Sequence, residues 1–163
     1  MKHNSDVQAD AHFMPFVNGG FDTVWCVAVL LYCQSPVDVV REASRVLRPG
    51  GYLVVYEPFN LVPEMDGDWQ RLTPAGLKRL GEMAKLETVE IRSCGGMLSV
   101  MLQAANDQCY YRAGRGHYGK FINMLLSPFL PILLSVDDRF CQRDADYARY
   151  STGWIYVGQK RCT

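Results

Sequence analysis

The residues of this chain that could take part in chemistry gather where two predicted strands end. Cys26 and Val27 close the apolar run from Phe21 to Ala28, and Glu57 follows the run from Tyr52 to Tyr56. Doubly wound α/β sheets bind their ligands at the carboxyl ends of the strands. We therefore expect a binding site at this edge, in which Glu57 acts as a base or as an orienting hydrogen-bond acceptor.

Both chemical candidates have a structural alternative. Pairing with a nearby arginine, or capping of the loop that begins at Pro58, explains the Glu57 carboxylate equally well. Cys26 lies within an apolar run, where a cysteine behaves as a small hydrophobic residue. Core packing is therefore the better explanation for Cys26.

The sequence offers no other kind of catalytic centre. It holds no Ser-His-Asp or Cys-His set, and His3, His12 and His117 lack metal-ligand spacing. The six cysteines show no CxxC pattern or small disulfide scaffold, and no signal peptide precedes them, which predicts reduced thiols in a cytoplasmic protein. Seventeen basic residues balance seventeen acidic ones without a basic run, so nothing favours nucleic-acid binding.

A strand, a helix and a second strand position the candidate residues. Phe21–Ala28 and Tyr52–Tyr56 are apolar runs typical of strands buried on both faces of a parallel sheet. Between them, the Ser35 hydroxyl is expected to cap a helix that begins with Pro36. Pro49-Gly50-Gly51 then ends the helix and turns the chain. Two strands joined in this way run parallel with a right-handed crossover.

Further elements follow this unit. The pattern predicts a helix from Thr73-Pro74, a strand at Glu87–Arg92, a helix from about Leu98 to Tyr111 and a final strand at Thr152–Gln159. The apolar run Phe121–Val136 contains two prolines and is shorter than the roughly twenty residues of a membrane span. We expect it to form a helical lid on the sheet. The alternative is a surface that receives a lipidic or bulky apolar substrate or contacts a membrane.

An ordered set of short motifs runs through the first third of the chain. It comprises Asp10-Ala11, Met14-Pro15-Phe16, Phe21-Asp22, the turn from Arg45 to Gly51, and Glu57-Pro58. In this order and spacing, the set resembles the class I S-adenosylmethionine-dependent methyltransferases, specifically the type 11 group. The resemblance covers Val7–Pro58 well and the last strand adequately. It is loose from Gly95 to Asp146, where the family varies with its substrate.

The resemblance implies S-adenosylmethionine as cofactor and methyl transfer to a small acceptor that can be apolar. In the family's pattern Asp10 accepts a hydrogen bond from the adenine amino group, and Ala11 donates its backbone amide to the ring. The backbone of Cys26 and Val27 lines the methionine end of the cofactor. The alternative for Asp10 is a turn or cap residue. Tyr32 stands where many members have a histidine, and it either orients an acceptor or packs.

The sequence departs from the family in lacking its glycine-rich cofactor loop, since Gly19-Gly20 lies too late in the chain. The expected fold class is α/β: a partial doubly wound, Rossmann-like methyltransferase sheet with a helical insertion before the last strand. We expect one truncated domain over residues 1–163. It would contain a cofactor-side unit at 7–58, a variable helical lid or substrate region at 95–146, and the last strand at 152–159.

The family's strand order is third, second, first, fourth, fifth, seventh, sixth. This chain would supply the fourth to seventh strands and a remnant of the third near Val7–Ala9, which leaves Phe21–Ala28 as an open edge. We expect that edge to pair with a second copy of the chain or with an absent amino-terminal half. Two other functions are open: an inactive methyltransferase-like interaction protein that binds a partner through this edge, and a membrane-surface module that uses Phe121–Val136.

Overall fold

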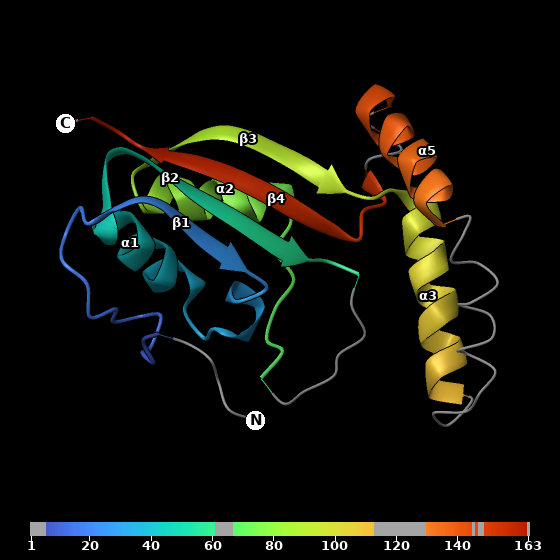
Figure 1. Ribbon diagram of the computed structural model, residues 1–163, viewed down its shortest axis with the longest axis horizontal. Coiled ribbons are helices and arrows are strands. Elements are labelled where there is room, and N and C mark those ends of the chain that lie inside the picture. The colour runs from blue at the N-terminus through green and yellow to red at the C-terminus, as the bar shows by residue number, and fades with distance from the viewer. Residues whose placement is uncertain (1–5, 61–66, 113–129, 145, 147–148, 163) are drawn as a thin grey trace. The chain divides into compact units, whose positions relative to one another are not determined.

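The computed structural model describes residues 6–60, 67–112, 130–144, 146 and 149–162. Two compact units make up the chain: residues 1–57, 66–91 and 155–163 belong to the first, and residues 58–65 and 92–154 to the second. The elements in chain order are β1 (Phe21–Val27), the 3-10 turn η1 (Leu30–Tyr32), α1 (Pro36–Val46), β2 (Leu47–Pro58), α2 (Pro74–Met83), β3 (Leu86–Cys94), α3 (Met97–Arg112), α5 (Leu130–Arg143) and β4 (Gly153–Lys160) (Figure 1).

The four strands form one sheet in the order β1-β2-β4-β3. β1 and β2 pair in parallel, with Thr23 opposite Tyr52 and Val27 opposite Tyr56, which confirms the parallel unit. The position of β4 between β2 and β3 confirms the predicted order of the last three strands. The prediction of a strand remnant at Val7–Ala9 is wrong. A strand needs a hydrogen-bonded neighbour, and none of the described strands provides one there.

α1 begins directly after Ser35, as the sequence predicts, but the predicted hydroxyl cap is absent. The Ser35 hydroxyl donates a hydrogen bond of 2.6 Å to the Asp38 carboxylate and does not bond a helix amide. The charged carboxylate is a strong acceptor for the hydroxyl proton, so the Ser35 side chain binds Asp38. The helix start is instead closed by the Ser35 carbonyl, which accepts from the amides of Asp38 and Val39.

The chain passes from α1 into the sheet through an irregular stretch at Arg48–Gly51, which makes β2 longer than the predicted Tyr52–Tyr56. Gly50 has a φ of +77°, in the left-handed region that favours glycine. A Cβ on Gly51 would lie 2.8 Å from the Asp22 carbonyl oxygen of β1. The two glycines therefore let the backbone turn and approach β1 closely.

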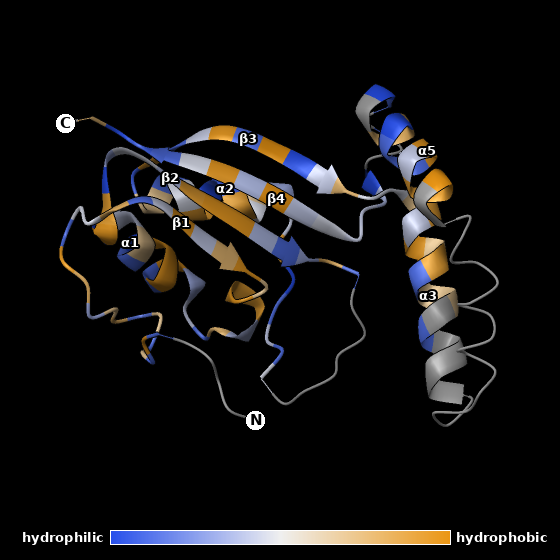
Figure 2. Ribbon diagram, viewed as in Figure 1, coloured by the Kyte–Doolittle hydropathy of each residue, from blue (hydrophilic) through white to orange (hydrophobic). Residues whose placement is uncertain are grey.

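One face of the sheet in the first unit is covered, and the other is exposed. Leu53 and Val55 of β2 are buried, as is Cys26 of β1, while Trp25 and Val27 are 71% and 54% exposed. The prediction that both strands are buried on both faces is therefore wrong for the described residues. The helices α1 and α2 cover one face, and no described element of this unit covers the other (Figure 1). Figure 2 shows the alternation of apolar and hydrophilic residues along β3 that the sequence predicts.

α2 packs against β4 through a glycine. The helix begins as Thr73-Pro74 predicts, with the Thr73 hydroxyl accepting from the Gly76 amide at 3.1 Å. Tyr156 of β4 is 1% exposed, and a Cβ placed on Gly81 would overlap its hydroxyl oxygen. The tyrosine ring thus fills the space that a larger residue in α2 would need.

In the second unit a buried aspartate joins two helices. Asp137 of α5 is fully buried. Its carboxylate accepts hydrogen bonds from the amides of Gly96, Leu98 and Ser99 at 2.6, 3.2 and 3.0 Å, and from the Ser99 hydroxyl. These amides lie at the start of α3, where a helix leaves its first amides without internal partners. An acid from a distant helix therefore supplies the N-terminal cap of α3.

Most of the apolar run Phe121–Val136 lies outside the described residues, which resume at Leu130 with α5. The helical lid and its membrane-surface alternative therefore stay predictions. None of the described helices is long and apolar enough to cross a membrane. Over the same residues, no cluster of histidine, cysteine and acidic side chains could hold a metal ion.

The contact between Gly81 and Tyr156 makes a prediction about stability. Gly81→Ala should lower the free energy of unfolding by about 1–3 kcal/mol, because overpacking forces a rigid buried ring to move. The matched control is Gly76→Ala in the same helix, where the added Cβ meets ordinary contacts of 3.5 Å or more. It should leave stability unchanged or raise it by up to about 1 kcal/mol through helix propensity. Urea unfolding measures both, and equal effects of the two substitutions would refute the packing argument.

Candidate functional site

Asp10 heads a tight turn in the segment that precedes β1. Its carbonyl oxygen accepts from the Phe13 amide at 3.0 Å. Its Oδ1 accepts from the His12 amide at 2.9 Å and lies 2.7 Å from the His12 Nδ1. The bonds from His12 lower the pKa of the Asp10 carboxyl. The carboxylate is therefore charged at neutral pH, and its side chain is 62% exposed.

α1 fixes the segment that follows this turn. The Met14 amide donates to the Glu42 carboxylate at 2.8 Å. The Arg45 guanidinium donates to the carbonyl oxygens of Phe16 and Met14 at 2.8 and 3.0 Å, and it pairs with Glu42 at 2.7 Å. One ion pair on a helix thus holds the backbone just after Asp10 and Ala11. The sequence signal for this role is the spacing of Glu42 and Arg45 by three residues, which places the two side chains side by side on a helix.

A hollow of about 1040 Å³ opens beside the Asp10 turn. Asp10 and Ala11 line it, together with Tyr32 and Cys33. The remaining lining comes from neighbouring residues of the same turn and from the start and outer face of α1: Ala9, His12, Phe13, Gln34, Ser35, Asp38, Arg41, Glu42 and Arg45. Three residues singled out from the sequence, Asp10, Ala11 and Tyr32, therefore face one space.

A second hollow, of about 110 Å³, adjoins the first and is apolar. Ala11 lines both hollows, and Cys26 contributes to the second. The other lining residues are supplied mainly by β1, α1 and β2: Met14, Val24, Trp25, Val29, Val39, Val40, Ala43, Leu53 and Val55. Burial, with a further contribution from the charge of Glu57, raises the pKa of the Cys26 thiol to about 12. Cys26 is thus a neutral wall residue at physiological pH.

Val27 and Glu57 line neither hollow. Val27 lies on the exposed face of β1. The Glu57 side chain is 1% exposed, and its two carboxylate oxygens accept from the amides of Val29, Leu30 and Leu31 at 3.1, 2.8 and 3.2 Å. Burial raises the pKa of the Glu57 carboxyl, and the three amide bonds oppose that rise. The positive charge of Arg71 also opposes the rise in the Glu57 pKa, so an arginine does act on this carboxyl, while the three amide bonds differ from the predicted capping of the Pro58 loop.

The same backbone turn is also held by Trp69 and Gln70, which lie in the irregular stretch before α2. The Gln70 side-chain amide donates to the carbonyl oxygens of Leu30 and Cys33 at 2.9 and 3.0 Å. The Trp69 backbone amide donates to the Leu31 carbonyl at 2.9 Å. No sequence signal predicts these contacts, because Gln70 lies in an irregular stretch without periodicity.

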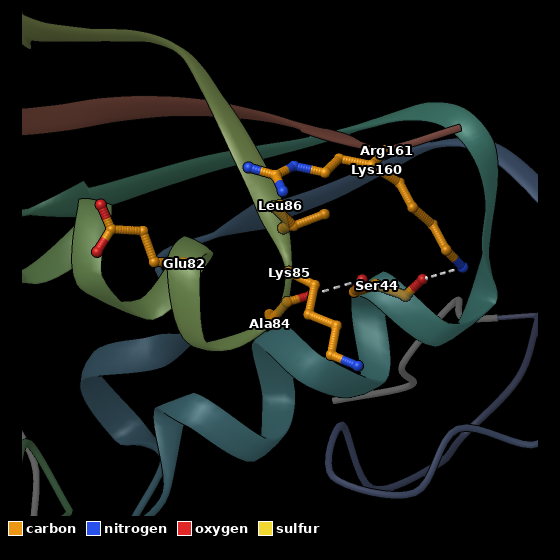
Figure 3. A pocket seen from close by; sticks show the side chains of 7 residues that line it. All are labelled: Ser44, Glu82, Ala84, Lys85, Leu86, Lys160 and Arg161. Atoms are coloured by element: carbon orange, nitrogen blue, oxygen red, sulfur yellow. Dashed lines mark hydrogen bonds between the residues drawn. The ribbon is translucent and has the colours of Figure 1, made fainter. Parts of the chain in front are cut away.

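A third hollow, of about 410 Å³, lies where α1 and α2 end (Figure 3). Lys160 of β4 donates to the carbonyl oxygens of Ser44 and Leu47 at 2.7 and 2.6 Å, and the Ser44 hydroxyl donates to the Ala84 carbonyl at 3.0 Å. Lys85 and Arg161 add two more cations to the lining. Helix carboxyl ends carry partial negative charge, so the helix ends account for these basic residues.

Comparison with known proteins identifies the amino-terminal segment. The model of the family described as "Methyltransferase domain" matches residues 1–55. A 27-O-demethylrifamycin SV methyltransferase of Amycolatopsis mediterranei is 38% identical over 71 residues, which cover 42% of this chain and 26% of that protein. A thiol S-methyltransferase of Homo sapiens is 46% identical over 52 residues, 32% of this chain and 20% of that protein. The chain thus matches about a quarter or less of the length of these relatives.

The fold extends the similarity beyond that segment. A crystal structure of a methyltransferase candidate from Bacillus halodurans superposes with a TM-score of 0.56, over 95% of this chain and 71% of that chain, at 19% identity. At this identity the likeness concerns the fold alone. It confirms the α/β fold class, with an open sheet that corresponds to part of a doubly wound, Rossmann-like methyltransferase domain.

The raised pKa of Cys26 predicts slow thiol alkylation. During a short exposure of the native protein to iodoacetamide at pH 8, Cys162, which is exposed, should react at least about a hundredfold faster than the buried Cys26, because the thiolate is the reactive form. Peptide mass spectrometry gives both rates, and labelling in urea is the control that makes both thiols accessible. Rapid native labelling of Cys26 would contradict its assignment as an inert wall residue.

Proposed function

We propose, from the premise that this chain belongs to the class I S-adenosylmethionine-dependent methyltransferases of the type 11 group, that its two adjoining hollows receive the nucleoside end of S-adenosylmethionine. The supporting observation is the placement of Ala11, which lines both the polar and the apolar hollow. Asp10 lies beside it with an exposed carboxylate. A ligand that combines an apolar ring with an amino donor suits this pair of residues.

The lining residues fit an adenine group. The smaller hollow offers apolar walls from Cys26, Val39 and Leu53, which suit the faces of a flat ring. The Asp10 carboxylate at the larger hollow is a charged acceptor for an amino group, and the backbone of Ala11 is the proposed partner of the ring nitrogen. Cys26 and Val27, at the end of β1, are proposed to lead toward the methionine end of the ligand.

S-Adenosylmethionine, when bound, supplies a methyl group that its sulfonium already activates. The task of the chain is then to bind and align the reactants, which can supply much of the rate acceleration. Tyr32 is proposed to orient the acceptor, because its side chain is 41% exposed and lines the larger hollow. Glu57 was the candidate base, but its bonds to three backbone amides favour a role as an anchor.

The acceptor is proposed only as a small molecule. Relatives named as an O-methyltransferase and as an S-methyltransferase both match parts of this chain, so the similarity does not select the acceptor atom. We propose that selection lies in the helical part from residue 95 to residue 146, where the resemblance is loose. An apolar acceptor would suit the apolar run that ends in α5.

Binding of S-adenosylhomocysteine tests the proposed function. The Asp10→Ala variant should bind it about 10- to 100-fold more weakly than the parent chain in calorimetry, because a hydrogen bond to a charged group contributes roughly 1.5–3 kcal/mol. Asp6→Ala, at an exposed acid four residues away that lines neither hollow, is the matched control and should keep the parent affinity. An absence of binding by the parent chain, or equal binding by Asp10→Ala, would remove the proposal.

The open edge of β1 is proposed to pair with another strand, either from a second copy of the chain or from a further part of the same domain. β1 is the terminal strand of the described sheet, and Trp25 and Val27 are exposed on it. Exposed apolar edge strands recruit other strands through their free backbone groups. This chain by itself should therefore self-associate.

Light scattering after size-exclusion chromatography tests this association. The parent chain should elute as a dimer or larger species. Trp25→Lys should shift it toward the monomer, because a charge on an edge strand opposes pairing. Val89→Lys changes an exposed apolar residue on the opposite edge strand, β3, and should leave the association intact. A monodisperse monomer of the parent chain would argue against the proposed edge.

A further inference from the structure

The backbone turn that follows β1 is held by hydrogen bonds on its amide side. Ala28 has a φ of +52°, a left-handed conformation that is costly for any residue except glycine, and its amide donates to the Tyr56 carbonyl at 2.8 Å. The next three amides, of Val29, Leu30 and Leu31, all donate to the Glu57 carboxylate. One buried acid thus stabilises a strained change of direction at the end of the strand.

Separate groups hold the carbonyl side of the same turn. The Gln70 side chain binds the carbonyls of Leu30 and Cys33, and the Trp69 backbone amide binds the carbonyl of Leu31. Glu57 thus binds the backbone amides of this turn, while Gln70 and Trp69 bind its backbone carbonyls. Within this turn the Leu30 and Leu31 side chains are each 1% exposed, whereas Tyr32 is 41% exposed and lines the larger hollow.

Burial makes the charged form of Glu57 less favourable in the folded chain. Because burial raises the pKa of Glu57 in the folded chain, the folded state holds a proton there more tightly than the unfolded state does. The protonated form is therefore the one that favours folding, and this contribution is lost as the pH rises through the folded-state pKa. Burial of this acid thus does not favour its charged form, and its bonds to three backbone amides argue that it serves the geometry of the turn.

We propose that Glu57 and Gln70 are positioning residues that together hold Tyr32 at the wall of the larger hollow. Glu57 does not act as a proton-transfer base in this arrangement, because both of its oxygens bind backbone amides and its side chain lies away from the hollow's lining. The expected effect of these two residues on S-adenosylhomocysteine affinity rests on the proposed function. The order of the turn itself is independent of any ligand.

Hydrogen exchange of the ligand-free chain tests the structural part. Glu57→Gln and Gln70→Ala should each accelerate exchange of the amides from Val29 to Cys33 by about tenfold, the effect of losing one hydrogen bond. Glu87→Gln, at an exposed position of β3, is the matched control and should leave that exchange unchanged. Unchanged exchange in both turn variants would overturn the proposal. If Glu57→Gln does not fold, the half-buried Gln70 gives the result alone.

S-Adenosylhomocysteine affinity and its pH profile test the positioning part. The two variants should weaken binding by similar factors, and the double variant should weaken it by less than the product of those factors, because both residues hold one turn. A change in pH profile in Glu57→Gln alone, with normal binding in Gln70→Ala, would overturn the proposal in favour of a titrating base. Failure of the parent chain to bind the ligand would refute the proposed function, while the exchange result would still decide whether Glu57 and Gln70 order the turn.

Discussion

The parallel pairing of β1 and β2 is the constraint from which the site follows. Because both strands run in one direction, their carboxyl ends reach the same edge of the sheet. The turn that leaves β1 therefore meets Glu57 near the end of β2, although 26 to 28 residues separate the partners in sequence. An antiparallel pair would send these two ends to opposite edges, and the buried carboxylate would lack its three amides. The wall that carries Tyr32 depends on this single pairing.

Local sequence patterns predicted the helices and strands well, but they could not predict the contacts between residues far apart in the sequence. The Thr73-Pro74 helix start and the order of the last strands could be predicted from helix-start chemistry and from the resemblance. The orientation of Glu57 could not, because its partners are backbone amides, which every residue carries and no sequence pattern marks. The role of Gln70 could not be predicted either, because its partners are backbone carbonyls, which are equally common to all residues. The Ser35 hydroxyl was expected to accept from a helix amide, but it donates to the Asp38 carboxylate instead.

The exposure of one face of β1 and β2 differs from what their apolar composition predicts. Continuous apolar runs predict strands covered on both faces, yet Trp25 and Val27 of this chain are exposed. The apolar sequence shows that both faces of these strands are suited to burial. In the structure, the described residues bury only one of the two faces. The second face, which carries Trp25 and Val27, is apolar and is left exposed by the described residues of this unit. Such a face, combined with the open edge of β1, makes a further layer or partner the natural expectation.

The charges around the larger hollow set Asp10 apart from the other acidic residues that line it. Asp38 is paired with Arg41 at 3.1 Å, and Glu42 is paired with Arg45 at 2.7 Å, so these four charges compensate one another along α1. Asp10 instead contacts His12, and no arginine or lysine of the described residues forms an ion pair with it. Its carboxylate is therefore an acid of the hollow that no arginine or lysine of the described residues neutralises. A ligand that brings amino donors or a positive charge gains from this arrangement, whereas an anionic ligand is opposed by it.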